Sequence, residues 1–108
     1  MSESIILKKL REVAKRGEQI TYSDLARECK ITYNSIDERN NFHHILGEIS
    51  RKEVKKGKPM ISVLVYRKAD IERSCGKGFF ILADELKQRK KNETDKELQW
   101  RITGECWK

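Results

Sequence analysis

The sequence predicts an α+β fold that is mostly helical, with a small β-sheet and additional helices toward its carboxyl-terminal end. Three observations predict it. Apolar residues recur at helical spacing before residue 57, a β-branched and apolar run follows at 60–66, and a basic loop comes after that run. Helices followed by a strand that enters a basic loop are the order of a winged-helix module, so we expect a winged-helix-like fold.

Two helices are predicted in the first part of the chain, at 3–16 and 22–29. In both, apolar residues recur three and four positions apart, with charged residues on the other face. Gly17 supplies a stop for the first helix. Thr21 is typical of a helix N-cap, and Asp24, three residues on, is the expected reciprocal partner.

A third helix is predicted at 41–56, and Gly57 ends it. The segment before it, 30–41, is longer than the tight turn of a simple helix-turn-helix. Asn40 and Asn41 stand at the expected start of the helix. Side chains of this type at a helix start either cap the helix or project toward a partner.

The apolar run indicates a strand at 60–67, and the loop at 68–78 would then be the wing. Helical spacing resumes beyond the loop, which predicts helices at 79–90 and 94–103. No low-complexity linker separates these segments. The whole chain of 108 residues is therefore predicted to be a single domain.

The charge of the chain is strongly positive. It has 24 Lys and Arg against 17 Asp and Glu, a formal net charge of +7 at pH 7. This surplus favours nucleic acid or another acidic surface as the partner, and it argues against an acidic mimic of DNA. A basic protein whose charges only solvate its surface is the alternative.

The sequence shows no secretion signal, and no apolar stretch approaches the roughly 20 residues of a membrane span. We therefore expect no membrane partner. Three cysteines, Cys29, Cys75 and Cys106, lie too far apart for a zinc motif, and their odd number does not suggest a disulfide framework. Reduced thiols and a cytoplasmic location are expected.

Motifs for catalysis, metal binding or cofactor binding are not evident, so we expect no enzymatic activity and no cofactor. His43 and His44 are adjacent and cannot both face one metal ion from a helix. Cys75 lies in the basic loop, where a thiol is either reactive through a lowered pKa or an ordinary loop cysteine. Gly76 and Gly78 either bring backbone N–H groups toward a phosphate or only turn the chain into the next helix.

We predict that the third helix and the wing bind nucleic acid, with duplex DNA as the expected form. Basic side chains would neutralise phosphates, and polar side chains at the helix start would face the bases. An aromatic side chain at the strand exit would stack on a base or sugar, unless it is only a half-buried strand tyrosine. The predicted contact residues are Asn40, Asn41, His43, His44, Arg51, Lys52, Lys55, Lys56, Tyr66, Arg67, Lys68, Arg73 and Lys77.

Three segments carry a resemblance to a known family. Residues 20–26, Ile-Thr-Tyr-Ser-Asp-Leu-Ala, resemble the segment that opens the winged-helix DNA-binding domain of alkylguanine alkyltransferases and alkyltransferase-like proteins. Residues 45–49, Ile-Leu-Gly-Glu-Ile, are similar to that family's recognition helix. Residues 59–67 stand where the family has its Pro-Cys-His-Arg segment. The order matches over 20–80, and it implies a winged helix that binds DNA.

The chain departs from this family at the reactive positions, because the Pro-Cys-His-Arg motif is missing. Tyr66 falls where the family has its alkyl-accepting cysteine, and Arg67 falls where it has histidine. His44 stands near the position of the family's base-extruding arginine. The resemblance therefore does not imply alkyl transfer, and an alkyltransferase-like binder of DNA lesions is the third functional hypothesis.

A second resemblance leaves function open. The pattern His-x-x-Leu-Gly-x-Ile-Ser at 43–50, with Gly-x-Gly-Phe-Phe at 76–80, is similar to small uncharacterised bacterial and phage proteins. That resemblance implies no known activity. The second functional hypothesis is accordingly a protein-interaction module, such as an accessory or inhibitor protein of a mobile element that docks on an acidic partner.

Overall fold

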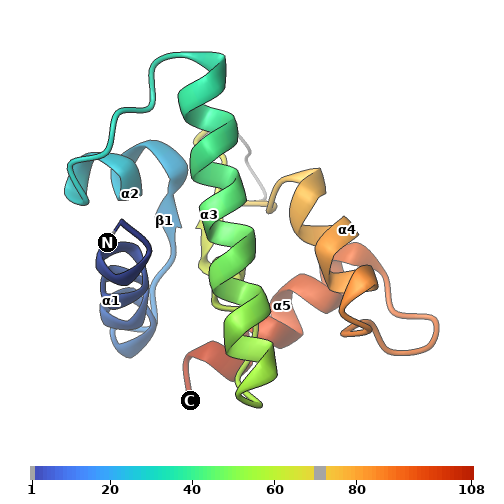
Figure 1. Ribbon diagram of the computed structural model, residues 1–108. Coiled ribbons are helices and arrows are strands. Elements are labelled where there is room, and N and C mark those ends of the chain that lie inside the picture. The colour runs from blue at the N-terminus through green and yellow to red at the C-terminus, as the bar shows by residue number, and fades with distance from the viewer. Residues whose placement is uncertain (1, 70–72) are drawn as a thin grey trace.

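The computed structural model describes residues 2–69 and 73–108, and this part of the chain contains five α-helices and one pair of short strands. The elements in chain order are α1 (Ser2–Lys15), β1 (Ile20–Thr21), α2 (Tyr22–Glu28), α3 (Ile36–Lys55), the 3₁₀ helix η1 (Ile61–Leu64), β2 (Val65–Tyr66), α4 (Lys77–Glu85) and α5 (Asp95–Cys106). In Figure 1, α3 runs through the centre, with α1 and α2 on one side and α4 on the other. The mostly helical fold with a small sheet agrees with the predicted α+β class.

The first two helices form where the sequence predicts them, to within one residue at each end. Gly17 follows α1 at φ +63°, a conformation that favours glycine and ends the helix. The Thr21 hydroxyl accepts a hydrogen bond from the Asp24 N–H at 3.1 Å and so caps α2. The reciprocal half of the cap is not formed, since the Asp24 carboxylate pairs with Arg27 at 2.9 Å.

The predicted start of the third helix is wrong by five residues, because α3 begins at Ile36. Ser35 and Glu38 form a capping box: the Ser35 hydroxyl accepts from the Glu38 N–H at 3.1 Å, and the Glu38 carboxylate accepts from the Ser35 N–H at 2.9 Å. A hydrogen bond from the Thr32 side chain, followed by backbone N–H bonds from Ser35 and Asn34, lowers the pKa of Glu38 to about 2. The predicted end is confirmed, with Gly57 at φ +75°.

The strand predicted at 60–67 is wrong over most of its length. Residues 61–64 form η1, and only Val65 and Tyr66 form a strand. The backbone turns here because the Val63 N–H donates to the Met60 carbonyl at 3.1 Å and the Ser62 N–H donates to the Ser50 hydroxyl at 3.1 Å. An apolar run that is buried on all sides carries no two-residue alternation, so its pattern cannot distinguish a strand from a buried helical turn.

The sheet is a parallel pairing of β1 with β2, in which Ile20 is opposite Val65 and Thr21 is opposite Tyr66. A wing would require a strand pair on the two sides of the loop at 68–78. The described part of that loop contains no such pair, and residues 70–72 lie outside the description. The winged-helix arrangement is therefore not confirmed.

The hydrophobic core is centred on η1, which packs against α1, α3 and α5. All four of its residues are buried. Around it lie large side chains that are less than 2% exposed, among them Phe42, Ile6, Leu10, Leu25, Ile49, Met60, Leu98 and Ile102. Most of these apolar residues are the ones that helical spacing predicts to face inward.

The last two helices differ from prediction at their ends. α4 stops at Glu85 rather than at residue 90. The chain turns just after Glu85, with Lys87 at φ +58° and the Gln88 N–H donating to the Ala83 carbonyl at 2.9 Å. α5 begins after Thr94 as predicted and continues three residues past 103, to Cys106. No helix in the described residues is both long and apolar enough to span a membrane.

Candidate nucleic-acid interface

The exposed side of α3 carries the polar residues that the sequence assigns to base contacts. Asn40, Asn41, His43 and His44 are all exposed. Because Ser35 caps α3, Asn40 and Asn41 lie in its second turn, and the alternative in which they cap the helix is wrong. Their amide groups can therefore face a partner from the side of a formed helix.

His43 is held in place by two tyrosines. Its ring stacks on Tyr22 with centroids 4.5 Å apart and planes 18° from parallel. Its Nε2 is 3.0 Å from the Tyr33 hydroxyl, a hydrogen bond in which either group can donate. Burial lowers the pKa of His43, so its ring is predominantly neutral at pH 7. These contacts fix the imidazole while leaving part of it exposed.

His44 lies in a groove between α3 and α4 with a volume of about 240 Å³. Gly47 and Arg51 of α3 line this groove together with Gly78 and Ile81 of α4. A smaller hollow of about 110 Å³ lies beside it, lined by Tyr22, His43, Gly47, Gly76 and Gly78 among others. The two histidines therefore both border the start of α4, where Lys77 is exposed.

Arg67 comes close to the same place. Burial raises the pKa of Tyr22 to about 12, and the smaller opposing influences are a hydrogen bond from the Gly76 backbone and the charge of Arg67. Tyr22 also stacks on His43. His43 and His44 of α3 thus border the start of α4, which carries Lys77. The pairing of Thr21 with Tyr66 places Arg67, the next residue, near Tyr22, which stacks on His43. We call His43, His44, Arg67 and Lys77 the histidine surface.

Two of the predicted phosphate contacts are neutralised within the chain. Arg51 pairs with Glu85 and, at 3.4 Å, with Glu48, and the Glu85 hydrogen bond is the main cause of its raised pKa. Lys52 pairs with Glu3 at 2.7 Å, which raises the pKa of the lysine. A cation paired in this way contributes less free energy to phosphate binding, because it must first separate from its acidic partner.

Lys55 and Lys56 remain available at the other end of α3. Both are exposed, and neither has a carboxylate partner within residues 2–69 and 73–108. Twelve residues separate Lys56 from His44, which corresponds to about 18 Å along a helix. Lys68 is also exposed.

Tyr66 and Arg73 belong to a different part of the surface. The Arg73 guanidinium lies over the Tyr66 ring, 5.4 Å from its centroid. Both line a hollow with Gly17, Gln19 and Trp107. Tyr66 is half-buried in β2, which agrees with the alternative of a half-buried strand tyrosine. The structure does not place Tyr66 with the histidine surface.

The basic loop does not expose a reactive thiol. Cys75 is 2% exposed, and burial raises its pKa to about 12. Its thiol donates to the Val63 carbonyl at 3.2 Å, and its N–H donates to the Gln99 side chain at 3.1 Å. The alternative of a thiol with a lowered pKa is therefore wrong, and Cys75 is part of the core.

Sequence reasoning missed the tyrosines that support His43. Tyr33 reaches His43 from the segment before α3, and Arg39 lies over the Tyr33 ring, 5.6 Å from its centroid. Arg39 and His43 are four residues apart and hence on one side of a helix. The four-residue spacing of Arg39 and His43 is visible in the sequence, but a helix that starts at 41 excludes Arg39 and so hides their common side. A helix start at Ser35, which the Ser-x-x-Glu pattern indicates, would reveal it.

Within the described residues, no group of three or more His, Cys, Asp or Glu side chains could hold a metal ion. Comparison of the chain with protein-family models, with curated proteins and with solved structures finds no match. A function must accordingly be inferred from the residues of this chain.

Proposed function

We propose that this chain binds duplex DNA without catalysing a reaction. The observation that carries the proposal is the histidine surface, where exposed polar groups of α3 lie near the start of α4 and near the end of β2, each of which carries a cation. A net charge of +7 favours a polyanionic partner. In this proposal, α2 and α3 form a helix-turn-helix pair with a long turn, and the loop after β2 acts as a short wing. The chain would bind DNA in the reducing environment of the cytoplasm.

In this mode the amino-terminal half of α3 enters the major groove, which is wide enough for one helix. Asn40 and His44 face base edges, because both are exposed on the side of α3 that is not buried in the core. Lys77 and Arg67 contact phosphates beside them. Lys55 and Lys56, about 18 Å further along the helix, contact phosphates beyond the groove.

The chemistry of the cysteines supports binding rather than alkyl transfer. Burial raises the pKa of Cys75 and of Cys106 to about 12, and it also raises the pKa of Cys29. A thiol with a raised pKa is predominantly protonated at pH 7 and is a poor nucleophile. This favours the non-enzymatic hypothesis over an acceptor of alkyl groups.

A salt titration of duplex binding tests the proposal. With about four to five phosphate contacts, we expect log K to fall with log salt at a slope of roughly −4. Lys77→Glu should weaken binding to all duplexes by about tenfold or more, because it places a negative charge on the histidine surface. Lys91→Glu is the matched control, since it makes the same charge change at an exposed loop position. Its effect should be much smaller.

A protein partner is the second candidate, and two exposed apolar residues favour it. Ile36 is 75% exposed at the start of α3, and Ile81 is 58% exposed in the groove beside His44. Apolar residues near a basic surface suit a partner with both apolar and acidic groups. Absence of duplex binding at low salt, or equal effects of the two lysine variants, would contradict the DNA proposal and leave this candidate.

A further inference from the structure

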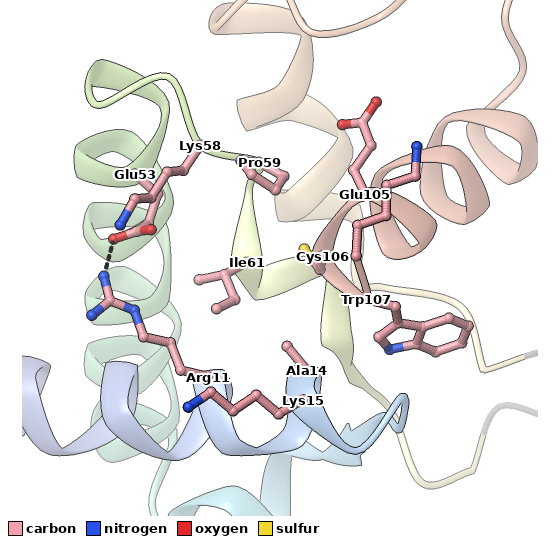
Figure 2. Close-up of a pocket in the computed structure, with 11 residues that line it drawn as sticks. Arg11, Ala14, Lys15, Glu53, Lys58, Pro59, Ile61, Glu105, Cys106 and Trp107 are labelled. Atoms are coloured by element: carbon pink, nitrogen blue, oxygen red, sulfur yellow. Dashed lines mark hydrogen bonds and ion pairs between the residues drawn. The ribbon is translucent and has the colours of Figure 1, made fainter.

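Another concave site lies at the carboxyl-terminal end of α3, remote from the histidine surface along the helix. It has a volume of about 280 Å³ and is formed by α1, the end of α3, the segment through η1, and the end of α5. Figure 2 shows Arg11 and Glu53 on one side, Cys106 and Trp107 on the other, and Ile61 between them.

One part of the wall is apolar. Ala14, Pro59, Ile61, Cys106 and Trp107 contribute to it. The Trp107 indole is fixed because its Nε1–H donates to the Glu18 carbonyl at 3.1 Å, yet the residue remains 40% exposed. Burial raises the pKa of Cys106 to about 12, so its neutral thiol adds apolar surface at pH 7. A flat apolar group can therefore pack here without displacing the indole.

The rim is positively charged. Four cations line the pocket: Arg11, Lys15, Lys58 and Lys108. Its two carboxylates are already engaged, Glu53 with Arg11 at 3.2 Å and Glu105 with Arg101 at 3.2 Å. Lys15 and Lys58 have no carboxylate partner within residues 2–69 and 73–108. An anion entering the pocket thus meets cations whose charge is not neutralised within the chain.

We propose that this pocket binds a small aromatic monocarboxylate, with its ring against Trp107 and Ile61 and its carboxylate toward Lys15 and Lys58. The volume is at the lower end of the range for ligand pockets, which favours a ligand of one ring. Glu53 is only 3% exposed and pairs with Arg11, so Lys15 and Lys58 are the cations left to face a single carboxylate on the ligand. The inference does not depend on DNA binding, because it uses none of the residues of the histidine surface.

Three small probes test the proposal by amide NMR on the full chain. Phenylacetate carries both a ring and a carboxylate, phenylacetamide carries the ring without the charge, and acetate carries the charge without the ring. We expect phenylacetate to bind with a Kd of about 1 mM or below and to shift the Trp107 indole N–H and the amides of Ile61 and Cys106. Phenylacetamide and acetate should each bind at least about fivefold more weakly.

Variants at the rim connect the binding to the pocket. Lys15 and Lys58 are exposed, so replacing both with glutamine should leave the fold intact and weaken phenylacetate binding by about tenfold. Replacing the exposed Lys90 and Lys91 with glutamine removes the same two charges elsewhere and should change the Kd by less than about twofold. The proposal is overturned if phenylacetate causes no shift at these amides, if phenylacetamide binds equally well, or if the double variant at Lys15 and Lys58 binds as tightly as the unmodified chain.

Discussion

Ser50 and Ser62 form a hydroxyl pair inside the core that ties α3 to η1. Their Oγ atoms are 2.7 Å apart, and the Ser50 hydroxyl also accepts from the Ser62 N–H at 3.1 Å. Ser50 is 0% exposed and Ser62 is 8% exposed. Buried polar groups that lose a partner cannot turn to water, so this pair makes the turn at residues 61–64 sensitive to single substitutions.

We predict that Ser50→Ala destabilises the protein more than Ser62→Ala. The first change leaves both the Ser62 hydroxyl and the Ser62 N–H without a partner, and it should lower the free energy of unfolding by about 2–3 kcal/mol. The second removes one hydroxyl while Ser50 still accepts from the Ser62 N–H, and it should cost about 1 kcal/mol. Urea denaturation of the two variants measures the difference. An equal or reversed order would contradict the assigned roles.

Local signals at single residues were readable from the sequence, whereas partners across the fold were not. Thr21 and Thr94 are caps that their own sequence neighbourhoods predict, and Gly17 adopts the left-handed conformation of a helix stop. The contact between Ser50 and Ser62 depends on how two elements pack, and nothing near either residue indicates it. The same limitation applies to His43, whose tyrosine partners come from α2 and from the segment before α3.

Charged side chains hold much of the segment between α4 and α5 in place. Arg101 of α5 bonds both oxygens of Glu93, at 2.8 and 2.9 Å, and the Gln88 carbonyl at 2.6 Å. The Arg101 hydrogen bond is the main cause that lowers the pKa of Glu93 from an ordinary value of 4.5 to about 2. Folding is therefore linked to the ionisation of this carboxyl group.

We predict that Glu93→Gln removes part of the acid sensitivity of the fold. Because the pKa of Glu93 is lower in the folded chain, its stabilising contribution is present above about pH 5 and is lost as the pH falls toward about 2. Glu93→Gln should therefore lower Tm at pH 7, and the difference from the unmodified chain should narrow between about pH 5 and pH 2.

Thermal unfolding at a series of pH values measures this effect. Asp37→Asn is the control, since it removes a carboxylate at an exposed position of α3. The unmodified chain should keep the steepest loss of Tm in acid. A difference between Glu93→Gln and the unmodified chain that stays constant down to about pH 2 would refute the linkage.

At the level of elements, the sequence predicts which segments are helical better than where they end. All five helices were anticipated from apolar spacing. The starting position of α3 was missed because residues 37–41, Asp-Glu-Arg-Asn-Asn, are all polar, so the apolar stripe becomes visible only at Phe42. The predicted strand failed for a different reason: residues 61–64 are buried all round, and their backbone bonds to Met60 and Ser50 decide the conformation.

For the whole molecule, η1 is the point at which the helices meet, since it contacts α1, α3 and α5. We predict that Leu64→Ala, at a residue that is 0% exposed, lowers the stability of the entire fold by about 3 kcal/mol. Ile36→Ala, at a residue that is 75% exposed, should change it by less than about 0.5 kcal/mol. Calorimetry should show one unfolding transition for each protein. A second transition in Leu64→Ala would mean that some helices unfold independently of η1.

The candidate surfaces also belong to this scale, because no single element contains either of them. Composition alone predicted a basic binding protein. Only the folded chain reveals that Arg51 and Lys52 are paired with acids, and that Arg67 reaches Tyr22 while its neighbour Tyr66 does not join the histidine surface. Tyr66 instead lies beneath the Arg73 guanidinium, in the hollow lined by Gly17, Gln19 and Trp107.

The pairing of β1 with β2 has a kinetic consequence. Ile20 and Val65 are 45 residues apart along the chain, and closing a loop of that length costs on the order of 3 kcal/mol of chain entropy. Strands of two residues offer only a few hydrogen bonds, each contributing about 1 kcal/mol, and these barely offset the cost of closure. The helices must therefore draw the two segments together first. We expect the strand pair to be among the last contacts to form during folding and among the first to separate when the native state opens locally.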